Sequence, residues 1–471
     1  MKVEQIYTGC IAHAAYYLES NGEAAIFDPL REVQPYIDRA AKDNAIIKYV
    51  FLTHFHADFV SGHLDLAKKT GAQIIYGPTA KPSYKIIAAH DGQVFRLGNY
   101  TIKVIHTPGH TLESTTFMLI EKDGTEHGLI TGDTLFIGDV GRPDLAQHVI
   151  ADLTQEKLAG YLFDSLRKKI MPLSDHLIVY PNHGAGSACG KMMSKETTDT
   201  LGHQKEVNYA LNPALTKQEF IKAILTGLTP PPGYFPKNVL MNLQGYESLD
   251  TVLERGRNAL SPEAFETAAN ENETLVLDTR NAADFAKGFI PNSINIGLEG
   301  NFAQWVGEMI SDIKQPILLV CNPGKEGEAM IRLSRVGYDG TIGYLEGGFE
   351  SWENAGKDND SQNRITADEF EKIYNTEKQL VIDVRKRTEF QSEHMIDAVN
   401  IPLNEINDHL SEIPKDKPFI IHCAGGYRSM IAASILKQRG WDNFTDVIGG
   451  FTDLAKKDLP KTAYMCPTSL L

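Results

Sequence analysis

The stretch Thr53-His54-Phe55-His56-Ala57-Asp58 places two histidines and a carboxylate within six residues. Residues 49–53 form an apolar, aromatic and β-branched run, which predicts a buried strand. Residues 61–69 predict a helix, with two lysines in its last turn and Gly71 just past its end. The histidines and the aspartate therefore fall in a strand-to-helix loop. Imidazole and carboxylate are ligands that suit iron, zinc or manganese.

Three later apolar runs end in residues of the same kind. Residues 101–106 alternate like a strand and lead to His110, residues 128–131 lead to Asp133, and residues 177–180 lead to His183. In layered α/β folds, functional sites collect where strand ends meet loops. We therefore expect these side chains to lie close to the loop that carries His54.

Length and composition limit the class of protein. A chain of 471 residues predicts two to four domains. The net charge of -15 argues against nucleic acid and anionic membranes as partners. We find neither a signal-peptide pattern nor an apolar stretch of about 18 residues, so no membrane span is expected. Five cysteines without a CxxC motif do not form a disulfide framework, which favours a cytoplasmic location.

The four motifs at 53–58, 107–111, 131–136 and 182–184 resemble the metallo-β-lactamase superfamily, and within it the glyoxalase-II-like branch. The resemblance covers about residues 1–250. It implies an αββα sandwich, in which two β-sheets pack face to face with helices outside. It also implies a metal site at one sheet edge.

Phe59 departs from that family pattern. Dinuclear zinc hydrolases of the superfamily usually read HxHxDH, and Phe59 stands where the last histidine would serve a second metal. The resemblance leaves one complete site, made of His54, His110 and Asp133. Two histidines and one carboxylate form the facial triad of non-haem ferrous iron. Persulfide dioxygenases of this superfamily are similar in using a single iron held at these positions.

This resemblance implies one Fe(II) per chain, with zinc as the alternative. It implies that O2 oxidises a low-molecular-weight thiol persulfide, of glutathione or a similar thiol, to sulfite and thiol. His56, Asp58 and His183 are then expected to orient ligands or water, or to serve a secondary metal position.

Two further residues are candidates for substrate binding. Arg142 lies in a Gly/Pro loop and could meet the carboxylate of a thiol substrate, or it could form a plain salt bridge. Cys189 follows His183 closely. In the fusion proteins that this chain resembles, a cysteine at this place lies near the iron, and the alternative is a small buried residue.

The segment from residue 205 to residue 236 combines a helical pattern with a proline-rich pattern. Residues 205–225 predict a helical stretch. Residues 229–236 hold four prolines, which predicts a semi-rigid extended segment that leads out of the first domain.

Beyond residue 255 the sequence repeats itself. Residues 275–280 recur at 380–385, residues 317–321 recur at 419–423, and a Gly-Gly-Phe triplet at 347–349 recurs at 449–451. The offsets are 383 − 278 = 105 and 423 − 321 = 102 residues. The repeat predicts two copies of a small α/β domain with a parallel sheet.

The second copy carries a clear nucleophile. A buried strand ends at Cys423, and a Gly-rich turn leads into a helix, so backbone N–H groups and the helix dipole should lower the pKa of that thiol. Arg428 adds a positive charge that can bind a sulfur oxyanion. Both are candidate catalytic residues, and the turn also supplies three candidate substrate-binding residues, Gly425, Gly426 and Ser429.

The motifs Asp-x-Arg, Cys-x-x-Gly-x-Arg-Ser and Gly-Gly-Phe resemble the rhodanese family, whose cysteine carries a persulfide. In the first copy, Glu326 takes the place of Arg428 and would repel an anion, and Pro323 removes one N–H donor. That copy is expected to be inactive and structural, with Cys321 as a relict. Cys10 and Cys466 have no supporting motif.

The predicted organisation is a metallo-β-lactamase-fold persulfide dioxygenase domain at 1–254, an inactive rhodanese-like domain at 255–357 and an active rhodanese domain at 358–471. End to end, this resembles bacterial fusions of a persulfide dioxygenase with tandem rhodanese domains. The resemblance implies that Cys423 transfers sulfane sulfur, forming thiosulfate from sulfite or working in reverse, in a homo-oligomer. The rivals are a zinc-dependent glyoxalase-II-type thioester hydrolase with regulatory rhodanese domains, and a sulfur carrier or sensor.

Overall fold

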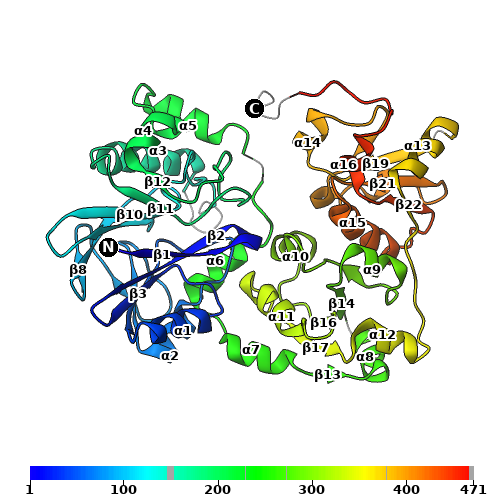
Figure 1. Ribbon diagram of the computed structural model, residues 1–471, viewed down its shortest axis with the longest axis horizontal. Helices are drawn as coiled ribbons and strands as arrows, with labels where there is room; N and C mark the ends of the chain where they lie inside the picture. The colour runs from blue at the N-terminus through cyan, green and yellow to red at the C-terminus, as the bar shows by residue number, and fades with distance from the viewer. Residues whose placement is uncertain (146–152, 229, 272, 378, 466–471) are drawn as a thin grey trace. The chain divides into compact units, whose positions relative to one another are not determined.

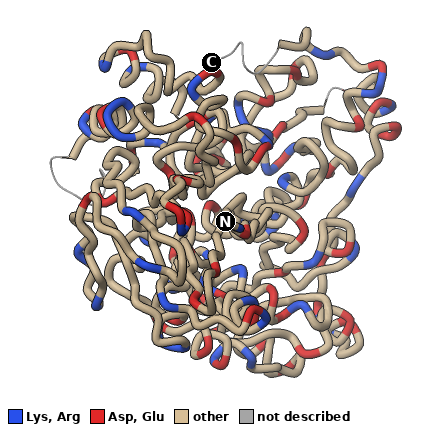
Figure 2. The backbone as a smooth tube through the Cα atoms, turned by 60° about the vertical axis from the view of Figure 1, so that its left-hand side comes forward, with Lys and Arg blue, Asp and Glu red and all other residues tan. Residues whose placement is uncertain are grey.

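The structure is a computed structural model that describes residues 1–145, 153–228, 230–271, 273–377 and 379–465 (Figure 1). The chain forms two compact units. The first comprises Met1–Thr251 with Leu333–Gly337, and the second comprises Val252–Arg332 with Tyr338–Leu471. Acidic and basic residues are interspersed along the described chain (Figure 2). Among the described helices, none has both the length and the hydropathy that a membrane crossing requires.

Two sheets form the centre of the first unit. Within the described residues, the first sheet has six strands in the spatial order β1 (Val3–Thr8), β2 (His13–Ser20), β3 (Glu23–Phe27), β4 (Ile46–Phe51), β5 (Gln73–Tyr76) and β6 (Ile87–Ala88). The second, over the same described part of the chain, has the order β12 (Asp199–Thr200), β11 (Ile178–Pro181), β10 (Glu126–Gly132), β9 (Thr115–Ile120), β8 (Tyr100–His106) and β7 (Val94–Leu97).

Apolar side chains join the two sheets and cover their outer faces. Phe27 and Phe51 of the first sheet pack with Phe117 of the second in a buried core between them. Helices α1 (Gln34–Lys42), α2 (His63–Thr70) and α6 (Phe235–Gln244) pack on the other face of the first sheet. Helices α3 (Gln155–Ser165), α4 (Leu201–Val207) and α5 (Lys217–Leu225) pack on the second. The αββα sandwich expected from the sequence is confirmed.

Strand direction explains why the site residues converge. β8 and β10 each run antiparallel to β9, and β11 runs parallel to β10, so β8, β10 and β11 all end at one edge of their sheet. β4 ends at Phe51, directly before the loop that begins the site, and α2 follows that loop. Gly71 ends α2 with a φ of 76°, a left-handed conformation that glycine adopts without strain.

Two local expectations are corrected. The helical stretch expected over 205–225 is broken: α4 ends at Val207, a 3-10 turn covers Tyr209–Leu211, and α5 begins at Lys217. The Asn208 side chain accepts a hydrogen bond from the backbone N–H of Ala210 and so favours a turn. The extended segment also ends early, because α6 begins at Phe235 with Pro236 in its first turn, where proline is tolerated.

The second unit holds two parallel sheets of the same topology. Within the described residues, the first has the order β13 (Ala259–Leu260), β17 (Thr341–Leu345), β16 (Ile317–Val320), β14 (Leu275–Asp278) and β15 (Ile294–Asn295). The second has the order β18 (Arg364–Ile365), β22 (Phe444–Val447), β21 (Phe419–His422), β19 (Leu380–Asp383) and β20 (Val399–Asn400). Each sheet follows the strand order first, fifth, fourth, second, third, which confirms the repeat.

Helices connect these parallel strands. In the first copy they are α8 (Pro262–Ala269), α9 (Ala282–Lys287), α10 (Phe302–Met309), α11 (Glu326–Arg335) and α12 (Gly348–Asn354), and α7 (Leu249–Gly256) precedes them. In the second copy they are α13 (Ala367–Thr376), α14 (Arg387–Ser392), α15 (Tyr427–Gln438) and α16 (Gly450–Leu454). Residues at the ends of β16 and β21 therefore lie directly before a loop and a helix N-terminus in both copies.

Candidate metal centre

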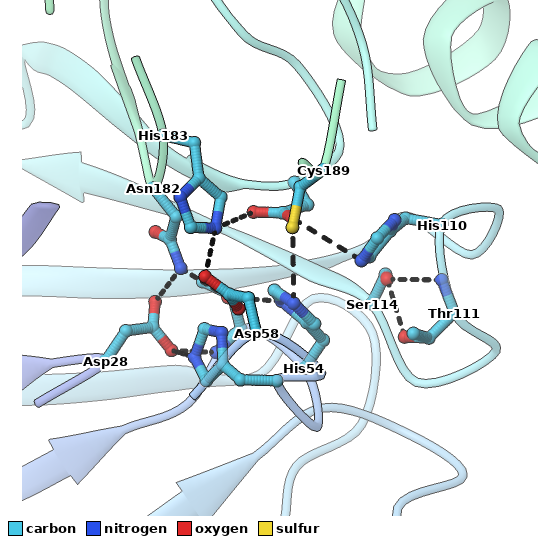
Figure 3. A network of polar contacts seen from close by, with 12 residues as sticks. Asp28, His54, Asp58, His110, Thr111, Ser114, Asn182, His183 and Cys189 are labelled. Carbon is cyan, nitrogen blue, oxygen red and sulfur yellow. Dashed lines mark hydrogen bonds and ion pairs between the residues drawn. The ribbon is translucent and has the colours of Figure 1, made fainter. Parts of the chain in front are cut away.

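Three buried side chains from three strand ends meet in the first unit. His54, His110 and Asp133 each offer one ligand atom, and these atoms lie within 4.8 Å of one another. Nε2 of His54 is 3.8 Å, and Nε2 of His110 is 3.4 Å, from Oδ2 of Asp133. Figure 3 shows His54 and His110 beside each other at this site. The structure thus brings together the three residues that the sequence singled out as metal ligands.

Hydrogen bonds on the far side of each imidazole fix its orientation. Nδ1 of His110 donates to the backbone carbonyl of Arg142 at 2.8 Å, and Nδ1 of His54 lies 2.9 Å from the Thr53 hydroxyl. Because a carbonyl oxygen only accepts, His110 carries its proton on Nδ1 and keeps the Nε2 lone pair for a metal. Burial, followed by the neighbouring histidines His56 and His110, lowers the pKa of His54 well below its usual value. Its neutral form is the one that binds a cation.

The carboxylate of Asp133 provides a test of whether a cation fits. The residue is 2% exposed, and neither of its oxygens has a hydrogen-bond partner among the described residues. A buried carboxylate without hydrogen bonds is costly unless a positive charge compensates it. Two imidazole nitrogens and this carboxylate fit a divalent transition metal such as iron or zinc.

His56 packs beside His54, with 4.2 Å between the ring centroids, and contacts a residue that the sequence did not single out. Its Nε2 lies 2.9 Å from Oδ1 of Asp28. Burial lowers the pKa of His56, but the charge and hydrogen bond of Asp28 outweigh burial, so the pKa is raised. Asp28 also accepts hydrogen bonds from the backbone of Thr53 at 2.8 Å and from the Asn182 side chain at 2.9 Å. This one carboxylate therefore ties three parts of the site together.

Phe59 and His13 fill the space behind His56. The Phe59 ring is fully buried and stacks on His56 at 4.3 Å between ring centroids. His13, also absent from the sequence prediction, lies 4.3 Å from Phe59, and its Nε2 donates to the backbone carbonyl of Asp28 at 2.9 Å. Phe59 thus packs as an apolar core residue at the position where dinuclear relatives would carry an imidazole.

A second group of donors faces the first. Asp58, His183 and Cys189 are buried, and their ligand atoms lie within 4.8 Å of one another. Figure 3 shows the Cys189 sulfur directed toward the rings of His54 and His110. Burial, and then the nearby charges of Asp58 and Asp133, raise the pKa of the Cys189 thiol well above its usual value.

Arg142 is a structural part of the loop around the site. Its guanidinium is 4% exposed and donates from Nε and Nη2 to the two carboxylate oxygens of Asp144, both at 2.7 Å. Its backbone N–H donates to the carbonyl of Cys189 at 3.0 Å, and its own carbonyl holds His110. Arg142 therefore links Cys189 to a metal ligand, and its binding of a substrate carboxylate stays a prediction.

The second rhodanese-like copy places Cys423 at the start of a helix-capping turn. The sulfur accepts a hydrogen bond from the backbone N–H of Gly426 at 3.1 Å, and α15 begins at the next residue. Gly450 has a φ of 54°, and a Cβ there would lie 2.4 Å from the carbonyl oxygen of Cys423. The Gly-Gly-Phe motif is therefore required for close passage beneath the nucleophile.

Two charged side chains at this turn pair with each other. Arg428 donates to both carboxylate oxygens of Glu389, at 2.6 and 2.8 Å. Burial lowers the pKa of Arg428, but the hydrogen bond and charge of Glu389 outweigh burial, so the pKa is raised. Ser429 is buried in the first turn of α15, and Gly425 has open space on its Cβ side. Arg428 thus carries its charge beside the loop in a fixed orientation.

The first copy lacks this arrangement. Cys321 accepts a hydrogen bond from the Thr279 hydroxyl at 3.2 Å, and burial raises the pKa of its thiol to about 12. Glu326 accepts a hydrogen bond from the backbone N–H of Gly324 at 3.1 Å, so a carboxylate uses an N–H that an anionic ligand would need. Cys10 is partly buried, and Cys466 lies outside the described residues.

Comparisons with known proteins match one family to the first part of the chain and a second family, twice, to the rest. The metallo-beta-lactamase superfamily profile matches residues 8–181, and the rhodanese-like domain profile matches residues 261–355 and 366–457. A solved structure of a metallo-beta-lactamase from Staphylococcus aureus is 30% identical with a TM-score of 0.64, over 73% of this chain and 98% of that one.

Curated relatives of the first domain include both hydrolases and a persulfide dioxygenase. A probable hydroxyacylglutathione hydrolase of Schizosaccharomyces pombe is 29% identical over 204 residues, which is 42% of this chain and 74% of that protein. The human mitochondrial persulfide dioxygenase ETHE1 is 28% identical over 205 residues, which is 42% of this chain and 70% of that protein. The chain belongs to the metallo-β-lactamase superfamily, and two rhodanese-like domains follow its metallo-β-lactamase domain.

Proposed function

We propose that this protein is an iron-dependent persulfide dioxygenase with a sulfurtransferase site at Cys423. The observation that carries the proposal is the donor set of the first cluster. Two histidines present Nε2, and Asp133 presents a carboxylate that has no hydrogen-bond partner among the described residues. Phe59 stands where a dinuclear hydrolase would use an imidazole. Two histidines and one carboxylate leave open positions on non-haem iron.

Bound ferrous iron would supply the redox chemistry that dioxygen requires. The residues of the chain prepare the site for it. The Arg142 carbonyl holds His110 in the tautomer with a free Nε2, and the Thr53 hydroxyl orients the His54 ring through Nδ1. The three ligands are at most 2% exposed, so bulk water is excluded from the reacting atoms. Asp58, His183 and Cys189 line the same space and can orient the sulfur end of a substrate.

Besides the persulfide and O2, the overall reaction requires only water. A thiol persulfide, O2 and H2O give the thiol and sulfurous acid, which ionises to sulfite. The outer sulfur loses four electrons and the two oxygen atoms gain four. The thiol could be glutathione or a similar small thiol, since the relatives of the first domain include hydroxyacylglutathione hydrolases.

The second activity belongs to Cys423. Its thiolate attacks the outer sulfur of a persulfide, so that a new S–S bond forms on Cys423 and the donor leaves as a thiol. Attack by sulfite on the outer sulfur then forms thiosulfate and returns the Cys423 thiolate. The Gly426 N–H and the N-terminus of α15 stabilise negative charge on sulfur, and Arg428 can attract an oxyanion. The same steps in reverse would supply persulfide. Formation of a homo-oligomer stays a prediction.

A zinc-dependent thioester hydrolase is the second candidate, because several curated relatives are hydroxyacylglutathione hydrolases. The full chain should be loaded anaerobically with Fe²⁺ in one sample and with Zn²⁺ in another. Oxygen uptake on glutathione persulfide by the iron sample supports the dioxygenase. Cleavage of a hydroxyacylglutathione thioester by the zinc sample, with no oxygen uptake by the iron sample, supports the hydrolase.

A further inference from the structure

We propose that Asn242 is a positioning residue for the first cluster of donors, formed by His54, His110 and Asp133. It acts through the backbone of the loop at residues 56–61. The proposal concerns how the chain holds a metal and does not depend on which reaction that metal performs. Asn242 lies in α6, beyond the part of the chain that matches the superfamily profile. A helix outside the matched part of the domain thereby becomes part of the metal centre.

The side-chain amide of Asn242 pairs with three backbone groups of this loop. Its Nδ2 donates to the carbonyls of His56 and Phe59, both at 2.8 Å. Its Oδ1 accepts a hydrogen bond from the N–H of Ser61 at 2.9 Å. Both N–H groups and the oxygen of the amide are therefore used. A carboxylate at this position could not donate to either carbonyl, so the pattern requires an amide.

These hydrogen bonds are shielded from water. Asn242 is fully buried, and so are the three residues that it contacts, His56, Phe59 and Ser61. A buried carbonyl or N–H that loses its partner costs about 1–3 kcal/mol. Without the amide, the loop would have to rearrange or admit water. The conformation of the loop therefore depends on this one side chain.

The residues that Asn242 holds lie directly against a metal ligand. The His56 ring lies 4.2 Å from the His54 ring, and the Phe59 ring lies 4.3 Å from the His56 ring, measured between centroids. A shift of the loop backbone is therefore passed to His54 through these ring contacts. Because Nε2 of His54 must point at the ion, a rotated ring would bind it less tightly.

Contacts on both sides anchor α6 at this position. The Tyr84 hydroxyl donates to the backbone carbonyl of Asn242 at 2.5 Å, and the Tyr246 hydroxyl donates to a carbonyl of the loop. Val239 and Leu243 of the same helix pack on the outer face of the first sheet. That sheet contains β4, the strand that leads into the metal site. The helix and the loop are thus fixed to the same support.

Asn238 provides a matched control one turn earlier on the same helix. It is also fully buried, but neither atom of its amide has a hydrogen-bond partner among the described residues. Replacing such an amide by leucine removes a buried polar group without breaking a hydrogen bond. Asn238→Leu and Asn242→Leu are therefore the same chemical change in one helix, and only the second breaks the contact with the loop.

The test measures Co²⁺ binding by the full chain in competition with a chelator. The ion that is lost in His110→Ala is the ion of the first cluster. We expect Asn242→Leu to weaken its binding about 10- to 100-fold. The d–d absorption bands of the bound cobalt, which report the arrangement of its ligands, should shift. Asn242→Ser, a milder change that leaves room for water, should move both readouts in the same direction, and Asn238→Leu should match the wild type.

Thermal melting of the metal-free protein separates positioning from stability. A residue with a structural role alone would lower the melting temperature and leave the cobalt affinity and bands of the folded protein unchanged. That result in Asn242→Leu and Asn242→Ser would overturn the proposal. An equal loss of affinity in Asn238→Leu would overturn it as well, because the effect would then belong to the whole helix. Wild-type protein without a cobalt ion that depends on His110 would also refute it.

Discussion

Oδ1 of Asp28 lies 2.9 Å from Nε2 of His56, and both side chains are fully buried. The same carboxylate accepts the backbone N–H of Thr53, the residue before the ligand His54. Asp28 therefore fixes both ends of the loop segment 53–56 beneath the metal centre. Groups in this position behind metal ligands tune affinity without touching the ion.

Asp28→Asn should weaken metal binding. The change removes the negative charge and turns one acceptor oxygen into a donor, so the side chain can no longer accept from Thr53 and His56 on one side and from the Asn182 amide on the other. We expect the affinity of the first cluster for iron or zinc to fall about 10- to 100-fold. Metal content after dialysis against a graded chelator measures it. Asp43→Asn, at an exposed position, is the control and should match the wild type, and equal affinity in both variants would contradict the role of Asp28.

Tyr427→Phe should slow sulfur transfer. Tyr427 lies four residues after Cys423 in the sequence. Its hydroxyl donates to the carbonyl of Gly297, in the first rhodanese-like copy, at 2.7 Å. Its ring also packs so closely that a Cβ at Gly300 would lie 3.1 Å from it. Loss of this hydrogen bond should cost about 1 kcal/mol and lower the thiosulfate sulfurtransferase rate several-fold. Oxygen uptake should not change.

The control for that variant is Tyr464→Phe, because Tyr464 is 68% exposed. Unchanged sulfur transfer in Tyr427→Phe would mean that the first copy does not support the loop of the second. The structure would then offer no catalytic reason for the tight packing of these two copies.

Only one of the two repeated cysteines should carry sulfur. The thiol of Cys321, with its pKa raised by burial to about 12, stays protonated at neutral pH and is a poor nucleophile. After incubation with thiosulfate, mass spectrometry of the intact protein should find one extra sulfur atom. Peptide mapping should place it on Cys423. Sulfur on Cys321, or the same sulfur load in Cys423→Ser, would contradict this assignment.

Asp446 should make the second unit less stable as pH rises. Burial raises the pKa of its carboxyl to about 6 from 3.8, although Arg364 donates to it at 2.9 Å. The folded state therefore binds the proton more tightly than the unfolded state. This contribution is fully present below about pH 4 and is lost as pH rises through about 6. It is on the order of 3 kcal/mol, at about 1.4 kcal/mol per pKa unit.

Asp446→Asn should flatten the decline of the melting temperature of the second unit between about pH 4 and pH 6. Differential scanning calorimetry across this range measures the slope. Asp416→Asn, at an exposed position, should keep the slope of the wild type. An unchanged slope in Asp446→Asn would show that Asp446 does not titrate in this range.

The sequence predicted the ligands because they obey a local rule. His54, His110 and Asp133 each follow an apolar strand, and strands that end at one sheet edge bring such residues together. Asp28 obeys the same rule, since it follows β3 directly, but a single carboxylate between Phe27 and Pro29 does not stand out as a motif. The loop after β4 stands out in the sequence because His54 and His56 lie close together beside Asp58.

Other features depend on tertiary packing and left no pattern in the sequence. His13 is a lone histidine at the start of β2, and only the fold places it behind Phe59. The contact between Tyr427 and Gly297 requires the two repeated domains to pack together. A salt bridge of Arg142 is one of the two interpretations that the sequence allows. The burial of its pairing with Asp144 has no signal in a Gly/Pro loop, because it depends on the surrounding fold.

Oxygen uptake by the full chain, loaded anaerobically with ferrous iron, on addition of glutathione persulfide tests the dioxygenase proposal. We predict one O2 consumed and one sulfite formed for each persulfide. His110→Ala should abolish both, because it removes a ligand, while His176→Ala, an exposed position, should react like the wild type. Cys423→Ser should also consume oxygen like the wild type. Iron-loaded protein that consumes no oxygen with this or other small persulfides, but cleaves a thioester when loaded with zinc, would contradict the dioxygenase activity and favour the hydrolase.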